Sequence, residues 1–351
     1  MKKFISLLLA ATLVLSLAAC GASKTENSAS PSTSPSQAAE ETVTDSHGNT
    51  FKLPMKLKNV IVLNSSVYEM ICALGKDDVV TGVSNATVYP ASAKDKTQYG
   101  DWRKPDVEKI LAAKPDAVIG YASWLDSGIS KQLTDAGIPV IMLDFYVPSK
   151  IPDEMLTLGK LFGAEDRAKE FNDDMKKIQE TVAENTKDVT QTTVYYEGYS
   201  DYKSVGKGSG GDELMKFANV KSLTGDQSTE YPQISDEWVL QQNPQMIVKL
   251  VSDTKKILGP DVMDDAAVKD LYSKIAARPG WNKVDAIANK KVLILSSRIG
   301  TCPLGSAIAP LFIAKTAYPD KFKDVDPQKM LEEMYKKYWG TDLTGIWSYT
   351  D

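Results

Sequence analysis

Short apolar runs alternate with helical segments along the first part of the chain. Apolar runs occupy residues 59–64, 79–83, 116–120 and 139–143, and the first of them (NVIVLN) is followed by the helical pattern SSVYEMICALG. Short β-rich runs separated by helical patterns of about 10–15 residues are typical of βα units and favour a parallel sheet. The pattern therefore predicts an α/β fold.

The alternation stops once and then resumes. A long, amphipathic and highly charged segment with no strand in it runs from about residue 152 to 189, and the later runs TTVYYEGY, PQMIVKL and KKVLILS restore the earlier rhythm. We therefore expect two Rossmann-like lobes with mostly parallel sheets, residues 42–150 and 190–351, with a ligand cleft between them. A single long helix, residues 151–189, is expected to join the lobes.

Composition and charge exclude some classes of function. The chain has 351 residues, of which 42% are hydrophobic and 25% charged, which is ordinary for a globular protein with room for two domains. Its net charge is −5, and no Lys/Arg cluster occurs beyond the extreme N-terminus. Because a nucleic-acid partner requires a basic face, we expect none.

The only histidine limits the chemistry further. His47 lies between two short strand-like runs, where a hairpin turn is the simplest placement. A Ser-His-Asp arrangement would need this residue, and a zinc site usually takes several imidazoles. We therefore expect no catalytic residue, no cofactor and no direct metal site. The adjacent Tyr195 and Tyr196 do not suit a bare ferric ion either, since neighbouring strand residues point to opposite faces.

The N-terminus has the features of an export signal. Two lysines precede an apolar run from Phe4 to Leu17, and small residues lead to Cys20, which predicts a signal peptide over residues 1–19. The end of this segment resembles a bacterial lipobox, which implies a lipid on Cys20 and a protein anchored to the outer face of the cytoplasmic membrane. A plain signal peptide with an incidental cysteine is the alternative. Residues 20–41 are rich in Ser, Pro and Ala and predict a flexible tether.

Two cysteines remain in the part expected to fold. Cys72 and Cys302 could pair, but Cys72 lies in an apolar helical pattern that favours a buried thiol. Their pairing stays open at this point.

An internal repeat relates the two expected lobes. The segments WRKPDVEKILAAKPDAVI and YPQISDEWVLQQNPQMIV align so that Trp102 and Tyr231 each precede a glutamate, Glu108 or Glu237, by six residues. A helix dipole favours a glutamate in the first turn by about 0.3–1 kcal/mol, so either glutamate alone is explained structurally. Their recurrence in both lobes, each behind an aromatic residue, points to a shared function.

From about Thr42 onward the chain resembles the cluster-III solute-binding proteins of ABC transporters, which take up ferric siderophores, haem and cobalamin. The resemblance rests on TVTDSHGNTFKLP, on PDVEKILAAKPDAVIG and ISDEWVLQQNPQMIV, and on ARPGWNKVDAIANKKVLIL. It implies that Glu108 and Glu237 dock onto arginines of a permease dimer. It also implies a chelated iron complex as cargo, a siderophore first, with cobalamin or haem as the alternative. A secreted enzyme on the same scaffold is the least favoured reading.

Ligand contacts are expected in loops at the carboxyl ends of the strands, where open α/β sheets bind. Aromatic side chains supply contact area, and Arg or Lys supplies charge for carboxylate or catecholate groups around a chelated metal. Such residues in the two lobes are Tyr89, Trp102, Arg103, Tyr121, Trp124, Tyr146, Lys203, Tyr231 and Arg298. For Arg103 and Arg298, a solvated surface charge is the alternative.

Other residues have simpler explanations. Residues 206–211 (GKGSGG) satisfy the GxGxxG pattern, but an exported protein meets few dinucleotides, and a loop at the cleft rim ahead of a helix explains them better. Arg278 is interpreted as structural, and three tryptophans as packing residues: Trp281, Trp339 and Trp347.

Overall fold

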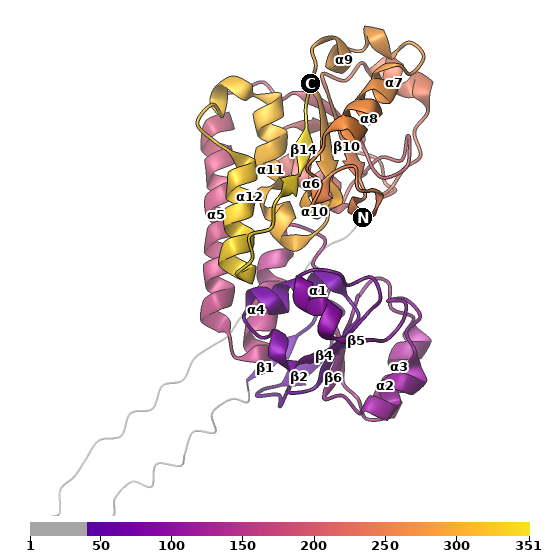
Figure 1. Ribbon diagram of the computed structural model, residues 1–351, viewed down its shortest axis with the longest axis vertical. Helices are drawn as coiled ribbons and strands as arrows, with labels where there is room; N and C mark the ends of the chain where they lie inside the picture. The colour runs from indigo at the N-terminus through magenta and orange to yellow at the C-terminus, as the bar shows by residue number, and fades with distance from the viewer. Residues whose placement is uncertain (1–40) are drawn as a thin grey trace, which may run out of the picture. The chain divides into compact units, whose positions relative to one another are not determined.

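The computed structural model of the protein describes residues 41–351, which form one compact unit with two α/β lobes (Figure 1). The predicted signal peptide, Cys20 and the tether up to residue 40 lie outside the described residues. In the part that the structure describes, no helix is long and apolar enough to span a membrane.

The N-terminal lobe is built on a parallel sheet. Its strand order is β5 (Thr97–Gln98), β4 (Val80–Val83), β3 (Val60–Val62), β6 (Ala117–Gly120) and β7 (Val140–Met142). The three central strands are almost entirely apolar and buried, as parallel strands covered on both faces require. The accompanying elements are the hairpin β1 (Thr42–Thr44) and β2 (Thr50–Lys52) and the helices α1 (Ser65–Ala73), α2 (Val107–Ala113) and α3 (Ser127–Asp135). The position expected for His47, in the hairpin turn, is confirmed.

The C-terminal lobe repeats this architecture with one antiparallel edge. Its sheet has the order β14 (Ser348–Tyr349), β12 (Val292–Ser296), β10 (Met246–Val251), β8 (Thr193–Glu197) and β9 (Lys221–Ser222), and only β14 runs antiparallel. A small sheet pairs β11 (Gly259–Pro260) with β13 (Gly345–Ile346). The helices are α6 (Gly210–Phe217), α7 (Asp236–Gln242), α8 (Ala266–Ala276), α9 (Asp285–Ala288), α10 (Ser297–Gly300), α11 (Pro303–Ala317) and α12 (Pro327–Trp339). The predicted fold, two α/β lobes with mostly parallel sheets, is confirmed.

The segment between the lobes differs from the expected single helix. It contains α4 (Ile151–Phe162) and α5 (Glu165–Thr186), separated at Gly163. Gly163 has φ 60°, a left-handed conformation that glycine adopts at little cost and that ends a helix. The buried side chains of α4 include Ile151 and Met155, which join the same core as the first sheet, and α5 continues to the second lobe.

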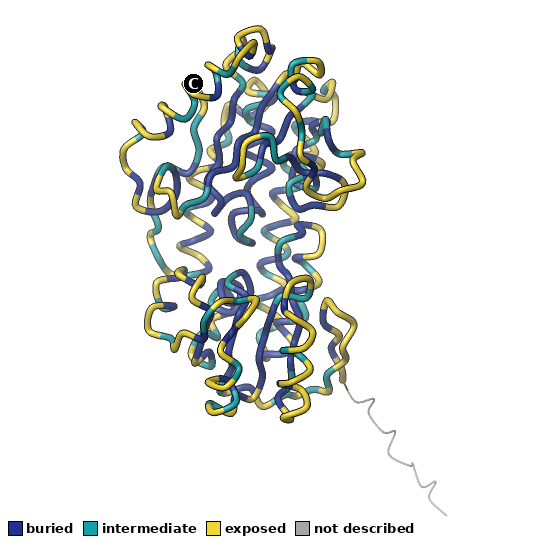
Figure 2. The backbone as a smooth tube through the Cα atoms, turned by 90° about the vertical axis from the view of Figure 1, so that its right-hand side faces the viewer, coloured by how far each residue is buried: buried dark blue, intermediate teal, exposed yellow. Residues whose placement is uncertain are grey.

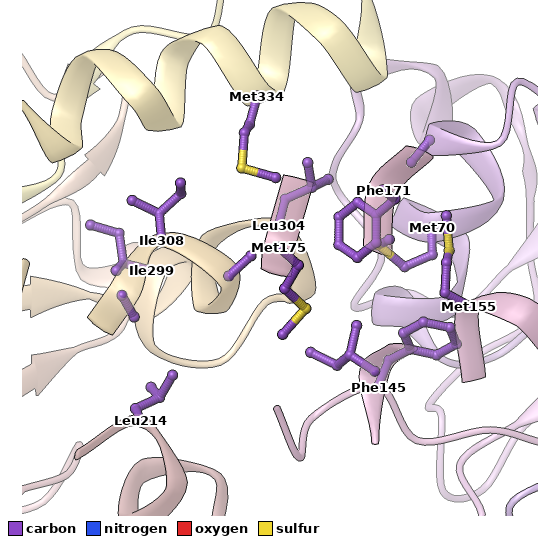
Figure 3. Close-up of a cluster of buried hydrophobic side chains, with 14 of the residues drawn as sticks. Met70, Phe145, Met155, Phe171, Met175, Leu214, Ile299, Leu304, Ile308 and Met334 are labelled. Carbon is purple, nitrogen blue, oxygen red and sulfur yellow. The ribbon is translucent and has the colours of Figure 1, made fainter. Parts of the chain in front are cut away.

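One hydrophobic core runs through both lobes. It includes Val60 of β3 and Leu293 of β12, and side chains of α5 and α11 fill the space between the sheets. Figure 3 shows Phe171 and Met175 of α5 beside Met70 and Phe145 on one side and Leu304 and Ile308 on the other. Figure 2 shows the strands of both lobes as buried and the connecting loops as largely exposed. Because interiors are close-packed, we expect this shared core to resist large changes in the angle between the lobes.

Buried aromatic side chains confirm several sequence interpretations. Trp281 and Trp347 are fully buried, and Trp339 packs against the core from α12. Tyr195 and Tyr196 belong to the clusters on opposite faces of the second sheet, as their adjacent positions in a strand predicted. Cys72 and Cys302 are both free thiols.

Candidate binding site

A cavity of about 330 Å³ opens between the lobes at the carboxyl ends of their strands. The loops after β6 and β7 contribute Trp124 and Tyr146, and the C-terminal lobe supplies the remaining walls. This position agrees with the rule that open α/β sheets bind ligands beyond the carboxyl ends of their strands. The lining residues of the C-terminal lobe are Tyr196, Gly198, Tyr199, Ser200, Lys203, Ser204, Val205, Gly210, Gly211, Tyr231, Leu250, Gly300 and Thr301.

A larger hollow of about 720 Å³ lies on the N-terminal lobe alone. It is lined by residues beside the β1–β2 hairpin and at the ends of α1 and α4, including Lys76 and Lys160. None of its lining residues follows the carboxyl end of a strand in either parallel sheet, and none comes from the second lobe. We therefore place the binding site in the smaller cavity.

The cavity between the lobes has one charged side chain. Lys203 is the only Asp, Glu, Lys, Arg or His in the lining, and its ammonium has no ion-pair partner among residues 41–351. The backbone positions it, since the N–H of Gly198 donates to the carbonyl of Lys203 at 2.7 Å and closes the loop after β8. An unpaired cation in an aromatic cavity favours a ligand with negative charge.

The phenols of the cavity are hydrogen-bond donors at neutral pH. Burial raises the pKa of Tyr199 and of Tyr231 to about 12, and it raises the pKa of Tyr196 further. The hydroxyl of Tyr199 lies 3.3 Å from Oγ1 of Thr301. Among residues 41–351 no group of three or more His, Cys, Asp or Glu could hold a metal ion.

An aromatic cluster around Arg103 continues the cavity on the N-terminal lobe. The Arg103 Cζ atom lies 4.3 Å from the ring centre of Trp102 and 5.3 Å from that of Trp124, and the ring centres of Trp102 and Tyr121 are 4.9 Å apart. Each cation–π contact at an exposed site contributes about 0.5–1 kcal/mol. Trp124, 43% exposed, belongs to both the cluster and the cavity wall. Arg103 has no carboxylate partner among the described residues, so its charge remains available to a ligand.

Tyr89 and Arg298 do not line the cavity. Arg298 is 5% exposed and pairs with Glu69 of α1, with Nη2 and Oε1 2.7 Å apart, so the pair joins the two lobes. The ring of Tyr89 lies over the guanidinium at 4.8 Å. Ligand contacts of Tyr89 and Arg298 stay predictions. The pairing of Arg298 with Glu69 was not predicted from the sequence. A glutamate inside an apolar helical pattern was the available signal, because buried carboxylates are paired.

Apart from the Gly-rich segment, nine residues of the cavity wall were not among the predicted contacts, and Tyr196, Leu250 and Thr301 are three of them. These three come from or just after three different strands of the second sheet, and only the sheet brings them together. By contrast, the Gly-rich segment was expected at the cleft rim, and Gly210 and Gly211 do line the cavity.

The two repeat glutamates are exposed and equivalent in position. Asp106 caps α2 by accepting from the N–H of Lys109 at 3.0 Å, and Ser235 caps α7 in the same way. Glu108 and Glu237 therefore each occupy the second position of a seven-residue helix. Neither side chain has a hydrogen bond or an ion pair within residues 41–351. Figure 1 shows both helices on the side opposite to α5.

Two α/β lobes with a shared core and a cavity at their strand ends define a two-lobe solute-binding protein. The sequence matches the family described as periplasmic binding protein over residues 60–299, which is more than half of the chain. The chain belongs to this family.

Relatives and solved structures agree with this assignment. The chain is 28% identical over 329 residues to YvrC of Bacillus subtilis (strain 168), an uncharacterized ABC transporter substrate-binding lipoprotein, covering 91% of this chain and 97% of YvrC. The structure of FepB from Veillonella parvula, a TroA-like periplasmic binding protein, superimposes with a TM-score of 0.73 at 23% identity over 88% of this chain and 99% of that one. Molybdate-bound MolA of Haemophilus influenzae gives a TM-score of 0.71 at 20% identity, over 87% of this chain and 100% of that one. At these identities the two structures establish the fold.

Proposed function

We propose that this protein captures a ferric siderophore outside the cytoplasm and delivers it to the permease of an ABC importer. In coarser terms it is the substrate-binding component of an ABC transporter of the cluster-III type. A permease dimer and its ATPase are the partners that this role requires. The name of YvrC as a lipoprotein supports the proposed lipid on Cys20 and attachment to the outer face of the cytoplasmic membrane.

The observation that carries the proposal is the chemistry of the cavity. Five aromatic side chains surround the single unpaired cation of Lys203, and the adjoining cluster presents the guanidinium of Arg103. No carboxylate lines the cavity, so an anionic ligand meets no like charge there. Ferric catecholate complexes combine negative charge with flat aromatic faces and fit both features.

The cavity volume favours a compact cargo. About 330 Å³ is near the lower end of the roughly 300–1,000 Å³ that small-molecule sites occupy. Such a volume suits a compact chelate better than a bulky corrinoid. MolA, whose structure holds molybdate, adds a small oxyanion to the compounds worth testing.

A fluorescence titration tests the proposal. Trp124 lies in the cavity wall, so a ferric catecholate siderophore should quench tryptophan emission in a saturable way, and haem, cyanocobalamin and molybdate serve as competing cargoes. Absence of a response to siderophores, haem and corrinoids would refute the proposed class of cargo. A larger response to molybdate would make a small oxyanion the better candidate for the cargo.

A matched pair of lysine variants locates the site. Lys203→Gln removes the cation of the cavity, whereas Lys207→Gln removes an exposed cation four residues away that does not line it. A hydrogen bond to a charged group is worth about 1.5–3 kcal/mol, so the first variant should weaken siderophore binding by about tenfold or more. The second variant should bind like the unchanged protein. Equal affinities in both variants would place the site elsewhere.

A further inference from the structure

The loop after β8 contacts the cavity on one side and the approach to α7 on the other. Five of its residues line the cavity: Gly198, Tyr199, Ser200, Lys203 and Ser204. The same loop pairs with residues 230–235, because the N–H of Ile234 donates to the carbonyl of Tyr202 at 2.9 Å and the N–H of Ser204 donates to the carbonyl of Pro232 at 2.9 Å. A shift of the loop would therefore carry the segment that leads into α7.

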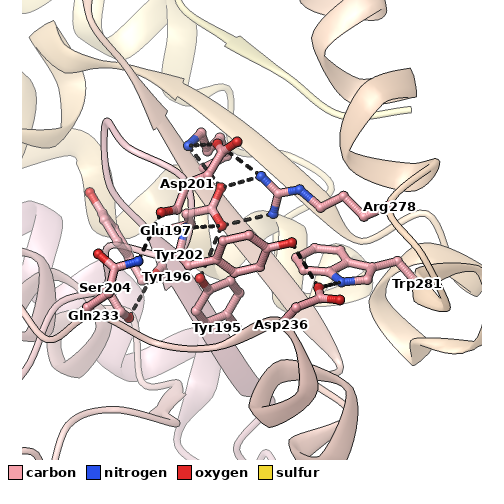
Figure 4. A network of polar contacts seen from close by, with 11 residues as sticks. Tyr195, Tyr196, Glu197, Asp201, Tyr202, Ser204, Gln233, Asp236, Arg278 and Trp281 are labelled. Atoms are coloured by element: carbon pink, nitrogen blue, oxygen red, sulfur yellow. Dashed lines mark hydrogen bonds and ion pairs between the residues drawn. The ribbon is translucent and has the colours of Figure 1, made fainter.

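Tyr202 points away from the cavity because of its backbone. Its φ is 60°, a left-handed conformation that costs a non-glycine residue of order 1–3 kcal/mol and persists only where neighbours hold it. Here the Tyr202 N–H donates to Oε2 of Glu197 at 2.9 Å. The ring lies edge-on to Trp281 with ring centres 6.2 Å apart, and its hydroxyl donates to Oδ1 of Asp236 at 2.8 Å (Figure 4).

The base of this loop is rigid. Glu197 accepts two hydrogen bonds of 2.9 Å from Arg278 and lies 2.9 Å from the ammonium of Lys249. Glu197 and Lys249 are both buried, and charged groups paired out of water hold each other closely. The loop is therefore held firmly at the end of β8, and Tyr202 is its connection to α7.

Asp236 is the residue of α7 to which the loop is bonded through Tyr202. It is the first residue of α7, it accepts hydrogen bonds from Tyr202 and from the indole N–H of Trp281, and it directly precedes Glu237. The matching helix of the other lobe, α2, begins with Val107, which has no carboxylate to be held in this way. The two exposed glutamates are thus equivalent in position, but only Glu237 follows a residue that is hydrogen-bonded to the cavity loop.

We propose that Tyr202 and Asp236 are positioning residues that couple occupancy of the cavity to the orientation of Glu237 at the start of α7. No matching carboxylate precedes Glu108 at the start of α2. The significance of Glu237 as a permease contact rests on the proposed function, but the coupling within the lobe does not.

Fluorine NMR of protein labelled with 5-fluorotryptophan tests the coupling. Trp124 reports the cavity wall, and Trp238 lies in the first turn of α7. The probes are ferric 2,3-dihydroxybenzoate, haem, cyanocobalamin and molybdate. Any probe that shifts the Trp124 resonance should also shift that of Trp238. In Tyr202→Phe the Trp124 shift should persist and the Trp238 shift should disappear.

The control is Tyr272→Phe, which removes a phenol hydroxyl from the same lobe at α8, where its ring packs on Tyr349. This variant should keep both probe-induced shifts. A Trp238 shift that survives in Tyr202→Phe would overturn the proposal. So would a Trp238 resonance that never moves while that of Trp124 does.

A second experiment needs no cargo, and it tests the coupling separately from the proposed siderophore cargo. If no probe shifts Trp124, the proposed cargo fails, and Lys203→Ala then serves as the perturbation of the cavity side. That substitution should shift the Trp238 resonance in the unchanged background and leave it in place when combined with Tyr202→Phe. Equal shifts in both backgrounds, or none in either, would overturn the coupling whatever the cargo is.

Discussion

Removal of one charge from the buried ion pair between the lobes should lower the free energy of unfolding more than removal of any other single charge in this protein. Glu69 lies on α1 of the N-terminal lobe and Arg298 on α10 of the C-terminal lobe, with side chains 2% and 5% exposed. Their charged atoms are 2.7 Å apart. The second oxygen of Glu69 and the Nε of Arg298 have no hydrogen-bond partner, so each charge depends on the other.

Glu69→Gln is the perturbation, because it keeps the shape of the side chain and removes the charge. Burial raises the pKa of Glu69, and the charge of Arg298 and its hydrogen bond oppose that shift. Without the carboxylate, the guanidinium stays buried and unpaired. Breaking a buried pair in this way costs about 3–5 kcal/mol, which is a large share of the roughly 5–15 kcal/mol that stabilise a folded domain.

Urea unfolding followed by circular dichroism measures the loss. Glu170→Gln is the matched control, since Glu170 lies on the exposed face of α5 beside Arg167 and Lys337, and exposed pairs are worth at most about 1 kcal/mol. A double variant, Glu69→Leu with Arg298→Met, should recover most of the stability because neither charge is then buried alone. If Glu69→Gln costs no more than Glu170→Gln, the pair does not hold the lobes and the reasoning fails.

Three further predictions concern docking, acid stability and the shared core. Charge reversal at both Glu108 and Glu237 should abolish transport and leave cargo affinity unchanged. Reversal at the exposed Glu184 of α5 should change neither transport nor affinity. A fall in affinity on reversal at Glu108 and Glu237 would contradict the docking role. Burial alone would raise the pKa of Glu197, but hydrogen bonds from Arg278 and the charge of Lys249 outweigh it and lower the pKa. The stability that Glu197 contributes is therefore present above its unfolded pKa of about 4.3 and lost as the pH falls through the lower folded value, so melting temperatures measured from pH 6 to pH 3 should fall less steeply in Glu197→Gln. Phe171→Ala should cost about 3–5 kcal/mol and keep one cooperative transition, since this ring lies in the core of both lobes, and two separate transitions would refute a shared core.

Local patterns were sufficient to predict most of the architecture. The strands of both sheet centres and the helices capped by Asp106 and Ser235 follow from apolar periodicity and capping residues, which depend on near neighbours in the chain. The opposite orientations of Tyr195 and Tyr196 follow from strand geometry alone. The break at Gly163 was missed because a single glycine costs a helix only about 1 kcal/mol, and its left-handed conformation is not visible in the periodicity. The edge strands β5, β9 and β14 have two residues each, too few for any pattern.

By itself the sequence determined the fold class and the internal repeat, and four of its predicted contacts line the cavity: Trp124, Tyr146, Lys203 and Tyr231. It could not distinguish Lys203 from Arg298, since both are cations that follow an apolar strand in the same lobe. The tertiary structure leaves Lys203 unpaired in the cavity and buries Arg298 against Glu69, which is 229 residues away in the chain. Secondary structure is set by neighbours along the chain, whereas the function of a charge is set by the partner that packing brings to it.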